Sequence, residues 1–234
     1  ERLTSSHRIY NIYGTCGIGI IAEYFTHGDI EEIALPEGGY LYDDHDEEGP
    51  LYCYNDLPGI TKLQISLHMA EAIADLHGYP GGIIVHQDIK MDQFFLNPNM
   101  NGVILNDFNR AEFMMWDEHE QKYCGYKEGF GMGNWRSPEE YYNEYLNEKV
   151  DVFSLGNNIY TLLTGLWVFY DIDDYATIQE LVASGERAYI DPRYKERSLA
   201  EAKLVEVIDR CHEYLHEDRP TIFEVVDMLW KALK

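Results

Sequence analysis

Apolar residues follow two patterns along this chain, with short runs in the first half and helical stripes in the second. Residues 9–24 are apolar but are interrupted by Gly14, Gly17 and Gly19, which predicts two short strands joined by a turn. Three shorter apolar runs predict further strands, and Asn101-Gly102 supplies a turn typical of a hairpin. These runs are residues 83–85, 94–96 and 103–105.

Residues 61–77 carry two neighbouring apolar stripes at helical spacing, which predicts a helix buried over most of its circumference. One stripe is Leu63, Leu67, Ala70 and Ala74, and the other is Ile65, Met69, Ile73 and Leu76. After residue 150 the pattern is helical, at residues 154–163, 177–184, 199–214 and 221–233. Strands early and helices late predict an α+β fold that is mostly α-helical.

The composition limits which partners the protein can bind and which cellular compartment it occupies. The chain has 18 Lys and Arg against 42 Asp and Glu, a formal net charge of −24, which argues against nucleic-acid and anionic-membrane binding and favours a basic partner. No apolar run has the length of about 18 residues that a membrane span requires. Because the four cysteines are scattered and no leader precedes Glu1, we expect a reducing, cytoplasmic setting and a chain that is part of a longer one.

Residues 35–60 are rich in Gly, Pro and Tyr and include the acidic run from Asp43 to Glu48. We expect an acidic loop insertion that is solvated, the alternative being a contact for a basic partner.

Two polar segments next to predicted strands carry the candidate chemistry. The first is His86-Gln87-Asp88-Ile89-Lys90-Met91-Asp92-Gln93, and the second is Asn106-Asp107-Phe108-Asn109. The first resembles the catalytic loop of eukaryotic protein kinases, and the second resembles their magnesium-binding Asp-Phe-Gly.

Three later segments extend the resemblance in the order that this family has them. They are Arg136-Ser137-Pro138-Glu139, Asp151-Val152-Phe153-Ser154-Leu155-Gly156 and His216-Glu217-Asp218-Arg219-Pro220-Thr221. The chain is therefore similar to a protein kinase domain of the Ser/Thr, tyrosine-kinase-like type. The resemblance implies that residues 1–25 are the end of the N-lobe with the hinge, that 26–234 are the C-lobe, and that 107–139 are the activation segment.

The resemblance also implies a role for each polar residue of the first two segments. Phosphoryl transfer depends on positioning a hydroxyl and neutralising phosphate charge. Asp88 would accept the proton of the substrate hydroxyl, and Lys90 would contact the γ-phosphate of ATP. Asp107 would bind Mg²⁺, and Gln93 stands where the family places a second metal-binding residue, an asparagine, so we expect altered metal binding there.

The segment Ile20-Ile21-Ala22-Glu23-Tyr24-Phe25 looks like the strand and hinge that hold adenine. By that likeness Ala22 is the gatekeeper, the backbones of Glu23 and Phe25 face the adenine edge, and Phe95 forms its floor. Asp29 would lie near the ribose, or it would serve as a helix N-cap. The glycines also match a dinucleotide fingerprint, but no capped helix follows them, so a strand turn is the better interpretation.

Other positions are assigned structural roles or depart from the family pattern. We expect a buried ion pair between Glu139 and Arg219, and we expect Asp151 to brace the catalytic loop. Gln87 replaces an arginine that usually orders a phosphorylated activation loop, so control by phosphorylation is disfavoured. Asn109 replaces a glycine and tolerates left-handed backbone angles.

The N-lobe residues that would contact the phosphates of ATP are missing from the start of the chain. A working kinase needs a glycine-rich loop and a strand lysine for the phosphates of ATP, yet residues 1–61 contain no lysine. Two hypotheses follow. The chain is an N-lobe-truncated piece of a kinase that phosphorylates Ser or Thr of a protein substrate and is inactive by itself, or it is a pseudokinase that serves as a binding or scaffolding module.

Overall fold

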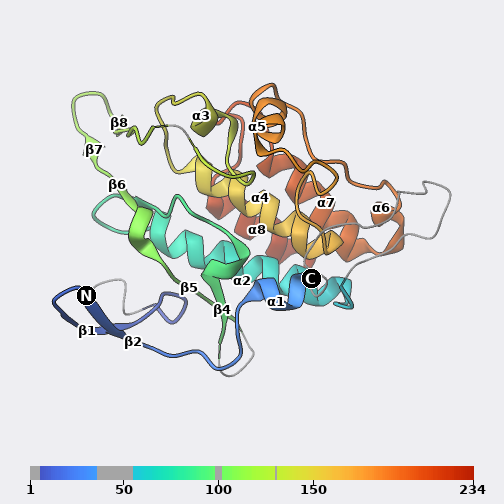
Figure 1. Cartoon of the computed structure of the whole chain (residues 1–234), viewed down its shortest axis with the longest axis horizontal. Helices are drawn as coiled ribbons and strands as arrows, with labels where there is room; N and C mark the ends of the chain where they lie inside the picture. The colour runs from blue at the N-terminus through green and yellow to red at the C-terminus, as the bar shows by residue number, and fades with distance from the viewer. Residues whose placement is uncertain (1–5, 36–54, 98–101, 130) are drawn as a thin grey trace.

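Helix α2 (Gly59–His77) forms the centre of the protein and is surrounded by other helices. The computed structural model describes residues 6–35, 55–97, 102–129 and 131–234. Helices α4 (Lys149–Thr164), α7 (Leu199–Cys211) and α8 (Ile222–Ala232) all pack against α2, and α7 also packs against α4 (Figure 1). The prediction of a helix buried on most sides is confirmed, because 11 of its residues are buried.

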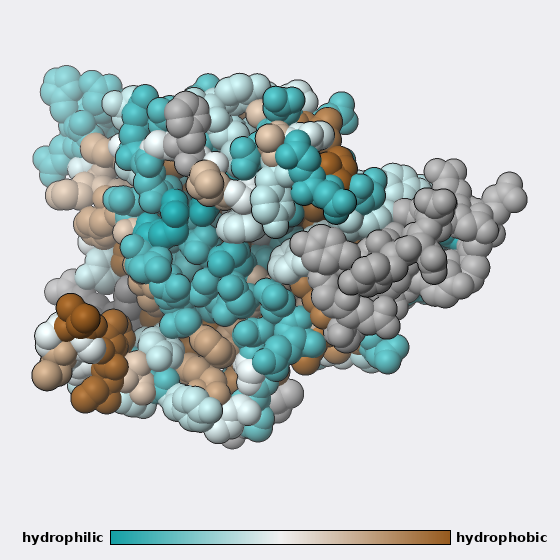
Figure 2. All heavy atoms as spheres, viewed as in Figure 1, coloured by the Kyte–Doolittle hydropathy of each residue, from teal (hydrophilic) through white to brown (hydrophobic). Residues whose placement is uncertain are grey.

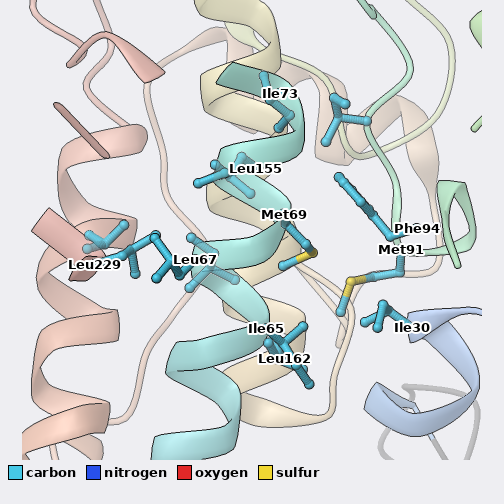
Figure 3. Packing of buried hydrophobic residues seen from close by; sticks show 14 of the residues in the cluster. Ile30, Ile65, Leu67, Met69, Ile73, Met91, Phe94, Leu155, Leu162 and Leu229 are labelled. Carbon is cyan, nitrogen blue, oxygen red and sulfur yellow. The ribbon is translucent and has the colours of Figure 1, made fainter. Parts of the chain in front are cut away.

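Apolar side chains on opposite sides of α2 contact different parts of the protein. Leu67 points toward Leu229 of α8, whereas Met69 points toward Met91 and Phe94 (Figure 3). Burial of such side chains supplies the main favourable contribution to folding. The segment that carries the catalytic-loop motif is thus attached to the same hydrophobic core as the C-terminal helix.

Shorter helices complete the fold. They are α1 (Ile30–Ala34), α3 (Pro138–Tyr141), α5 (Tyr175–Ala183) and α6 (Tyr194–Arg197), with single 3₁₀ turns η2 (Met91–Gln93) and η3 (Phe108–Arg110). Capping side chains fix where several helices begin. Asp174 accepts a hydrogen bond from the Thr177 amide at 3.0 Å, and Thr221 with Glu224 forms a capping box.

The described strands form antiparallel pairs. These are β1 (Ile12–Cys16) with β2 (Gly19–Ala22), β3 (Ile83–Val85) with β6 (Glu112–Met114), β4 (Phe94–Leu96) with β5 (Val103–Leu105), and β7 (Trp116–Asp117) with β8 (Lys122–Tyr123). In β4–β5, Phe94 lies opposite Leu105 and Leu96 opposite Val103. The chain before β1 is joined to this pair, since the Tyr10 amide donates to the Leu105 carbonyl at 3.0 Å.

The predicted α+β fold class is confirmed, as are the five predicted strands and the later helices within a few residues. The sequence pattern missed β6, β7 and β8, whose strands are two or three residues long and carry little periodicity. Residues 36–54, with the acidic run from Asp43 to Glu48, and residues 98–101 lie outside the described residues, so the loop and the hairpin turn there stay predictions.

The β1–β2 hairpin lies apart from the helical body (Figure 1), and its surface is hydrophobic (Figure 2). Ile18 is fully exposed, and Ile20 and Ile21 are more than 60% exposed. Among the described helices, none combines the length and the apolar character needed to cross a lipid bilayer.

Candidate active site

Asp151, at the start of α4, holds the catalytic loop through the loop's backbone. The amide groups of His86 and Gln87 donate to its two carboxylate oxygens at 2.8 Å each, and His77 Nε2 lies 3.0 Å from Oδ2. The Asp151 side chain is fully buried, so these donors replace water. They also stabilise the positive φ of 62° at Gln87, an unusual angle for a residue other than glycine. The predicted bracing by Asp151 is confirmed.

The His86 ring connects the catalytic loop to the segment after β5. Its Nε2 lies 2.7 Å from the Asn106 carbonyl oxygen, and its Nδ1 accepts from the Asp88 amide at 3.3 Å. Since Nδ1 accepts, Nε2 carries the proton and donates to Asn106. The ring also contacts Phe108 edge-on at 5.2 Å between centroids. His86 therefore packs and forms hydrogen bonds, as the sequence predicts.

The Asp88 carboxylate lies between two cations. Lys90 Nζ is 3.8 Å from Oδ2, and Arg136 Nη2 is 3.2 Å from Oδ1. Lys90 also lies 3.2 Å from Asp92 Oδ2. Asp88 and Lys90, the two predicted catalytic residues, are therefore brought together, and the carboxylate has a fixed orientation at the edge of the site.

Arg136 contacts the catalytic loop, which the sequence did not predict. Its nearly buried guanidinium donates to the Gln87 carbonyl at 2.9 Å and to Glu140 Oε1 at 3.1 Å, in addition to Asp88. Burial raises the pKa of Glu140, while Arg136 and the hydrogen bonds from Ser137 oppose that rise. An arginine next to Ser-Pro-Glu was visible in the sequence, but which loop its long side chain reaches was not.

The backbone just before Asp107 is bonded to Gln93, beside the catalytic loop. The Asn106 amide donates to the Gln93 carbonyl at 2.9 Å, which places Asp107 one residue from the Gln93 backbone. Asp107 has a φ of 57°, and its Oδ1 accepts from the Asn109 amide at 3.4 Å. One carboxylate and one amide side chain on adjoining segments fit Mg²⁺, which takes few protein ligands when it is bound with phosphates.

Asn109 does not adopt left-handed backbone angles. It lies within η3, and the left-handed backbone angles occur at Asp107 and Gln87 instead. The tolerance of asparagine for such angles is therefore not used at Asn109 in this conformation. The residue continues a 3₁₀ turn that begins after Asp107.

Among the predicted adenine-binding residues, Phe25 stacks on Phe95 of β4, and Asp29 forms a β-bridge with Phe95. Phe25 and Phe95 are 5.1 Å apart between centroids and nearly parallel, and Phe25 is buried. Ala22 ends β2, and the Glu23 amide donates to the Asn11 carbonyl at 3.1 Å. The ring predicted to form the adenine floor, Phe95, is thus covered in part by Phe25 of the predicted hinge.

Asp29 is the N-cap of α1, with its Oδ1 accepting from the Glu32 amide at 3.2 Å. This matches the N-cap alternative, while the ribose contact stays a prediction. Glu31, in the first turn of the same helix, has a raised pKa, chiefly because it is partly buried and secondarily because Asp92 and Asp29 lie near.

The predicted ion pair between Glu139 and Arg219 is confirmed. Arg219 Nη1 and Nη2 lie 2.6 and 2.8 Å from the two oxygens of Glu139, a bidentate arrangement. Carbonyls of Glu213 and Tyr214 accept further hydrogen bonds from Arg219, whose side chain is fully buried. The pair joins the end of the predicted activation segment to the turn before α8.

Sequence comparisons agree with this geometry. The family model of the protein kinase domain matches residues 18–231. Similar curated proteins include a nodulation receptor kinase of Pisum sativum, which is 29% identical over 74% of this chain and 19% of its own length. The LRR receptor-like serine/threonine-protein kinase ER1 of Oryza sativa subsp. japonica is 28% identical over 83% of this chain and 21% of its own length.

A third relative, the serine/threonine-protein kinase VIK of Arabidopsis thaliana, is 24% identical over 91% of this chain and 43% of its own length. This chain thus spans about a fifth of the length of the first two relatives and under half of the third. With the family model covering most of its residues, the chain belongs to the protein kinase domain family.

Proposed function

We propose that this chain is the C-lobe of a kinase that transfers the γ-phosphoryl group of ATP to a serine or threonine hydroxyl of a protein substrate. The observation that carries the proposal is the position of Asp88 beside Lys90, with its carboxylate oriented at the edge of the loop that Asp151 holds. The names of the relatives ER1 and VIK, both serine/threonine-protein kinases, support the choice of hydroxyl.

Each residue of the site has a defined task in this reaction. Asp88 accepts a hydrogen bond from the substrate hydroxyl and takes its proton as the oxygen attacks phosphorus. Lys90 provides positive charge next to the transferred group. Asp107 and Gln93 would hold Mg²⁺, which supplies neutralisation of the phosphate oxygens when bound. The net charge of −24 supports a basic protein substrate and argues against binding of nucleic acid or membrane. The four scattered cysteines support a location in the cytoplasm.

A test uses the polypeptide with its native flanking sequence, because residues 1–61 have no lysine to contact the phosphates of ATP. Transfer of labelled phosphate to an array of serine, threonine and tyrosine peptides is compared for the unmodified protein and Asp88→Asn. Loss of the base is expected to slow transfer by about 10²–10⁴-fold. Asp227→Asn, an exposed carboxylate on α8, serves as the matched control and is expected to leave the rate unchanged. Equal transfer by the Asp88→Asn protein and the control would refute the proposal.

A second candidate function is that of a pseudokinase that binds a partner without catalysis. Two contacts favour it, namely the stacking of Phe25 on the predicted adenine floor, Phe95, and the ion pair of Arg136 with Asp88. Thermal unfolding with and without Mg-ATP separates the candidates. A pseudokinase of this kind would show no ATP-dependent rise in Tm, whereas the kinase would be stabilised by its nucleotide.

A further inference from the structure

A cavity of about 220 Å³ lies between the start of α3, the turn that follows α3, and the turn that joins α7 to α8. Of the described residues around it, none is among those proposed to hold ATP, Mg²⁺ or the substrate hydroxyl. Sites for whole small-molecule ligands usually measure about 300–1,000 Å³, so this volume suits one long side chain of a partner protein. Its walls include Pro138, Tyr142, Glu144, Tyr214, Leu215 and His216.

The ion pair between Glu139 and Arg219 fixes two walls of this cavity relative to each other. Glu139 follows Pro138 on one wall, and both of its carboxylate oxygens accept from the Arg219 guanidinium. The same guanidinium donates to the Tyr214 carbonyl of the other wall at 2.9 Å. Tyr214 Oη in turn donates to the Ala183 carbonyl at 3.0 Å. The walls are therefore preorganised, which lowers the free-energy cost of binding.

The cavity carries an unbalanced negative charge. Arg219 neutralises Glu139, but within the described part of the chain no lysine, arginine or histidine pairs with the Glu144 carboxylate. The pKa of the Tyr214 hydroxyl is raised, first by loss of contact with water, next by Tyr142, and then by the Glu144 and Glu139 carboxylates. Glu144 therefore lies close to the Tyr214 ring, and a cation bound there would balance its charge.

Apolar and aromatic surfaces form much of the remaining wall. Tyr142 and Leu215 are 53% and 50% exposed, so an incoming side chain can reach both. Lysine and arginine lay their alkyl stems along apolar surface and keep the charge at a polar end. A cation is also attracted to the face of a tyrosine ring. An acidic side chain would be repelled by Glu144, and an apolar one would leave the carboxylate without a partner.

We propose that the cavity binds one lysine or arginine side chain of a partner protein, at a docking site separate from the site of phosphoryl transfer. The alkyl stem contacts Tyr142 and Leu215, and the cationic group donates to the Glu144 carboxylate. The formal charge of −24 on the whole chain adds long-range attraction for a basic partner. Binding here requires no phosphoryl transfer, so a kinase and a pseudokinase would both use the cavity.

Peptide binding tests the cavity directly. Four peptides share the sequence acetyl-Gly-Gly-X-Gly-Gly-amide, where X is lysine, arginine, or one of their neutral analogues norleucine and citrulline. Each is titrated into the isotope-labelled protein, and the amide signals of Tyr142, Glu144 and Leu215 are followed by NMR spectroscopy. At least one basic peptide is expected to bind about tenfold more tightly than its neutral analogue, as one charge-assisted hydrogen bond would give. Equal binding within both pairs, or no shift with any peptide, would overturn the proposal.

Variants assign the preference to this cavity. Glu144→Gln removes the carboxylate charge of an exposed side chain and is expected to reduce the ratio of basic to neutral affinity to about twofold or less. Leu215→Lys adds a competing cation to the wall and is expected to have the same effect. Glu180→Gln, at an exposed glutamate of α5, is the matched control and is expected to keep the tenfold ratio. A tenfold ratio that persists in either cavity variant, or one that falls equally in the control, would reject the cavity as the site.

The same proteins separate docking from phosphoryl transfer. Asp88→Asn is expected to lose transfer but to keep the tenfold binding ratio, because Asp88 does not line the cavity. Glu144→Gln is expected to lose the ratio but to transfer phosphate to a serine peptide without basic residues at an unchanged rate. If Asp88→Asn abolished the binding preference, the cation would be bound at the catalytic loop, and the docking proposal would fail.

Discussion

At the scale of single residues, the structure depends on charges that are buried with matched partners. Arg219 is the clearest case, because its fully buried guanidinium is satisfied by both oxygens of Glu139 and by backbone carbonyls. Lys62 is another, since its buried Nζ donates to the Leu163 carbonyl at 2.7 Å and lies 3.9 Å from Glu201. Removing one member of such a pair leaves an uncompensated charge in the interior.

Glu139→Gln is therefore expected to lower the free energy of unfolding by about 3–5 kcal/mol. Urea denaturation followed by circular dichroism measures the change. Asp227→Asn is the control, because its partner Lys231 is exposed, and it is expected to cost less than about 1 kcal/mol. Similar small losses for both variants would mean that the buried pair does not hold the activation segment against α8.

Residue identities allowed much of this site to be predicted. Asp88, Lys90, Asp151 and the Glu139–Arg219 pair lie in short motifs whose members are near each other in sequence or have a fixed partner in the family. Arg136 was missed because its contact with Asp88 joins positions 48 residues apart, and pattern along the chain carries no information about the direction of a long side chain. Stacking of Phe25 on Phe95 was missed for the same reason.

At the scale of elements, hydrogen bonds from Arg136 connect the end of the predicted activation segment to the catalytic loop. Its guanidinium contacts Gln87, Asp88 and Glu140, and its Nε donates to the Met132 carbonyl at 2.8 Å. These contacts order the segment before α3 with no phosphate group. They fit the expectation, drawn from Gln87, that control by phosphorylation of this segment is disfavoured.

Arg136→Gln is expected to loosen this attachment and to destabilise the protein more at pH 7 than at pH 4.5. Burial already raises the pKa of Glu140 above its ordinary value of 4.5, so the folded protein loses stability as pH rises from that value through the raised pKa. Without Arg136 the pKa rises further, and the loss with pH becomes larger. Amide hydrogen exchange at residues 131–137 is expected to accelerate in the variant.

Lys231→Gln provides the comparison, because Lys231 is exposed and its Nζ bonds to Asp227 one turn earlier on α8. It is expected to leave exchange at residues 131–137 and the pH dependence unchanged. The role given to Arg136 would be contradicted if the two variants had the same stability at both pH values.

The sequence predicted the type and the approximate bounds of an element wherever the apolar pattern repeated over many residues. Helix α2 was predicted within two residues, because two full apolar stripes mark it. The pairing of β3 with β6 was not predictable, since β6 has three residues and a partner 27 or more positions away. The strand pair exists because the neighbouring core of Ile83, Val85 and Met114 brings the two segments together.

At the scale of the whole molecule, the protein combines a well-buried helical body with an exposed apolar hairpin. Scattered exposed apolar residues are ordinary, but the surface of the β1–β2 hairpin is hydrophobic (Figure 2), and its exposed residues include Ile12, Ile18, Ile20 and Ile21. Such a surface is expected to bind apolar dyes and to promote self-association. The body does not depend on it, since the hairpin side chains point to solvent.

The double variant Ile18→Lys with Ile20→Lys is expected to reduce fluorescence of a bound anilinonaphthalene dye and light scattering at high protein concentration. The free energy of unfolding is expected to change by no more than about 0.5 kcal/mol for each exposed site. Leu199→Lys replaces a single exposed leucine at the start of α7 and is the control, expected to change neither signal. Unchanged dye fluorescence in the double variant would mean that the dye binds to a surface other than the β1–β2 hairpin.

His86 has a consequence for how the site moves. Its amide is bonded to Asp151, its Nδ1 to the Asp88 amide and its Nε2 to the Asn106 carbonyl, next to Asp107. Asp88, the proposed proton acceptor, and the segment that leads to Asp107, the proposed metal ligand, are thus both bonded to one imidazole ring, which the start of α4 holds in place. If neighbouring parts of the protein shift, these two carboxylates are expected to move together as one rigid unit, with the distance between them preserved.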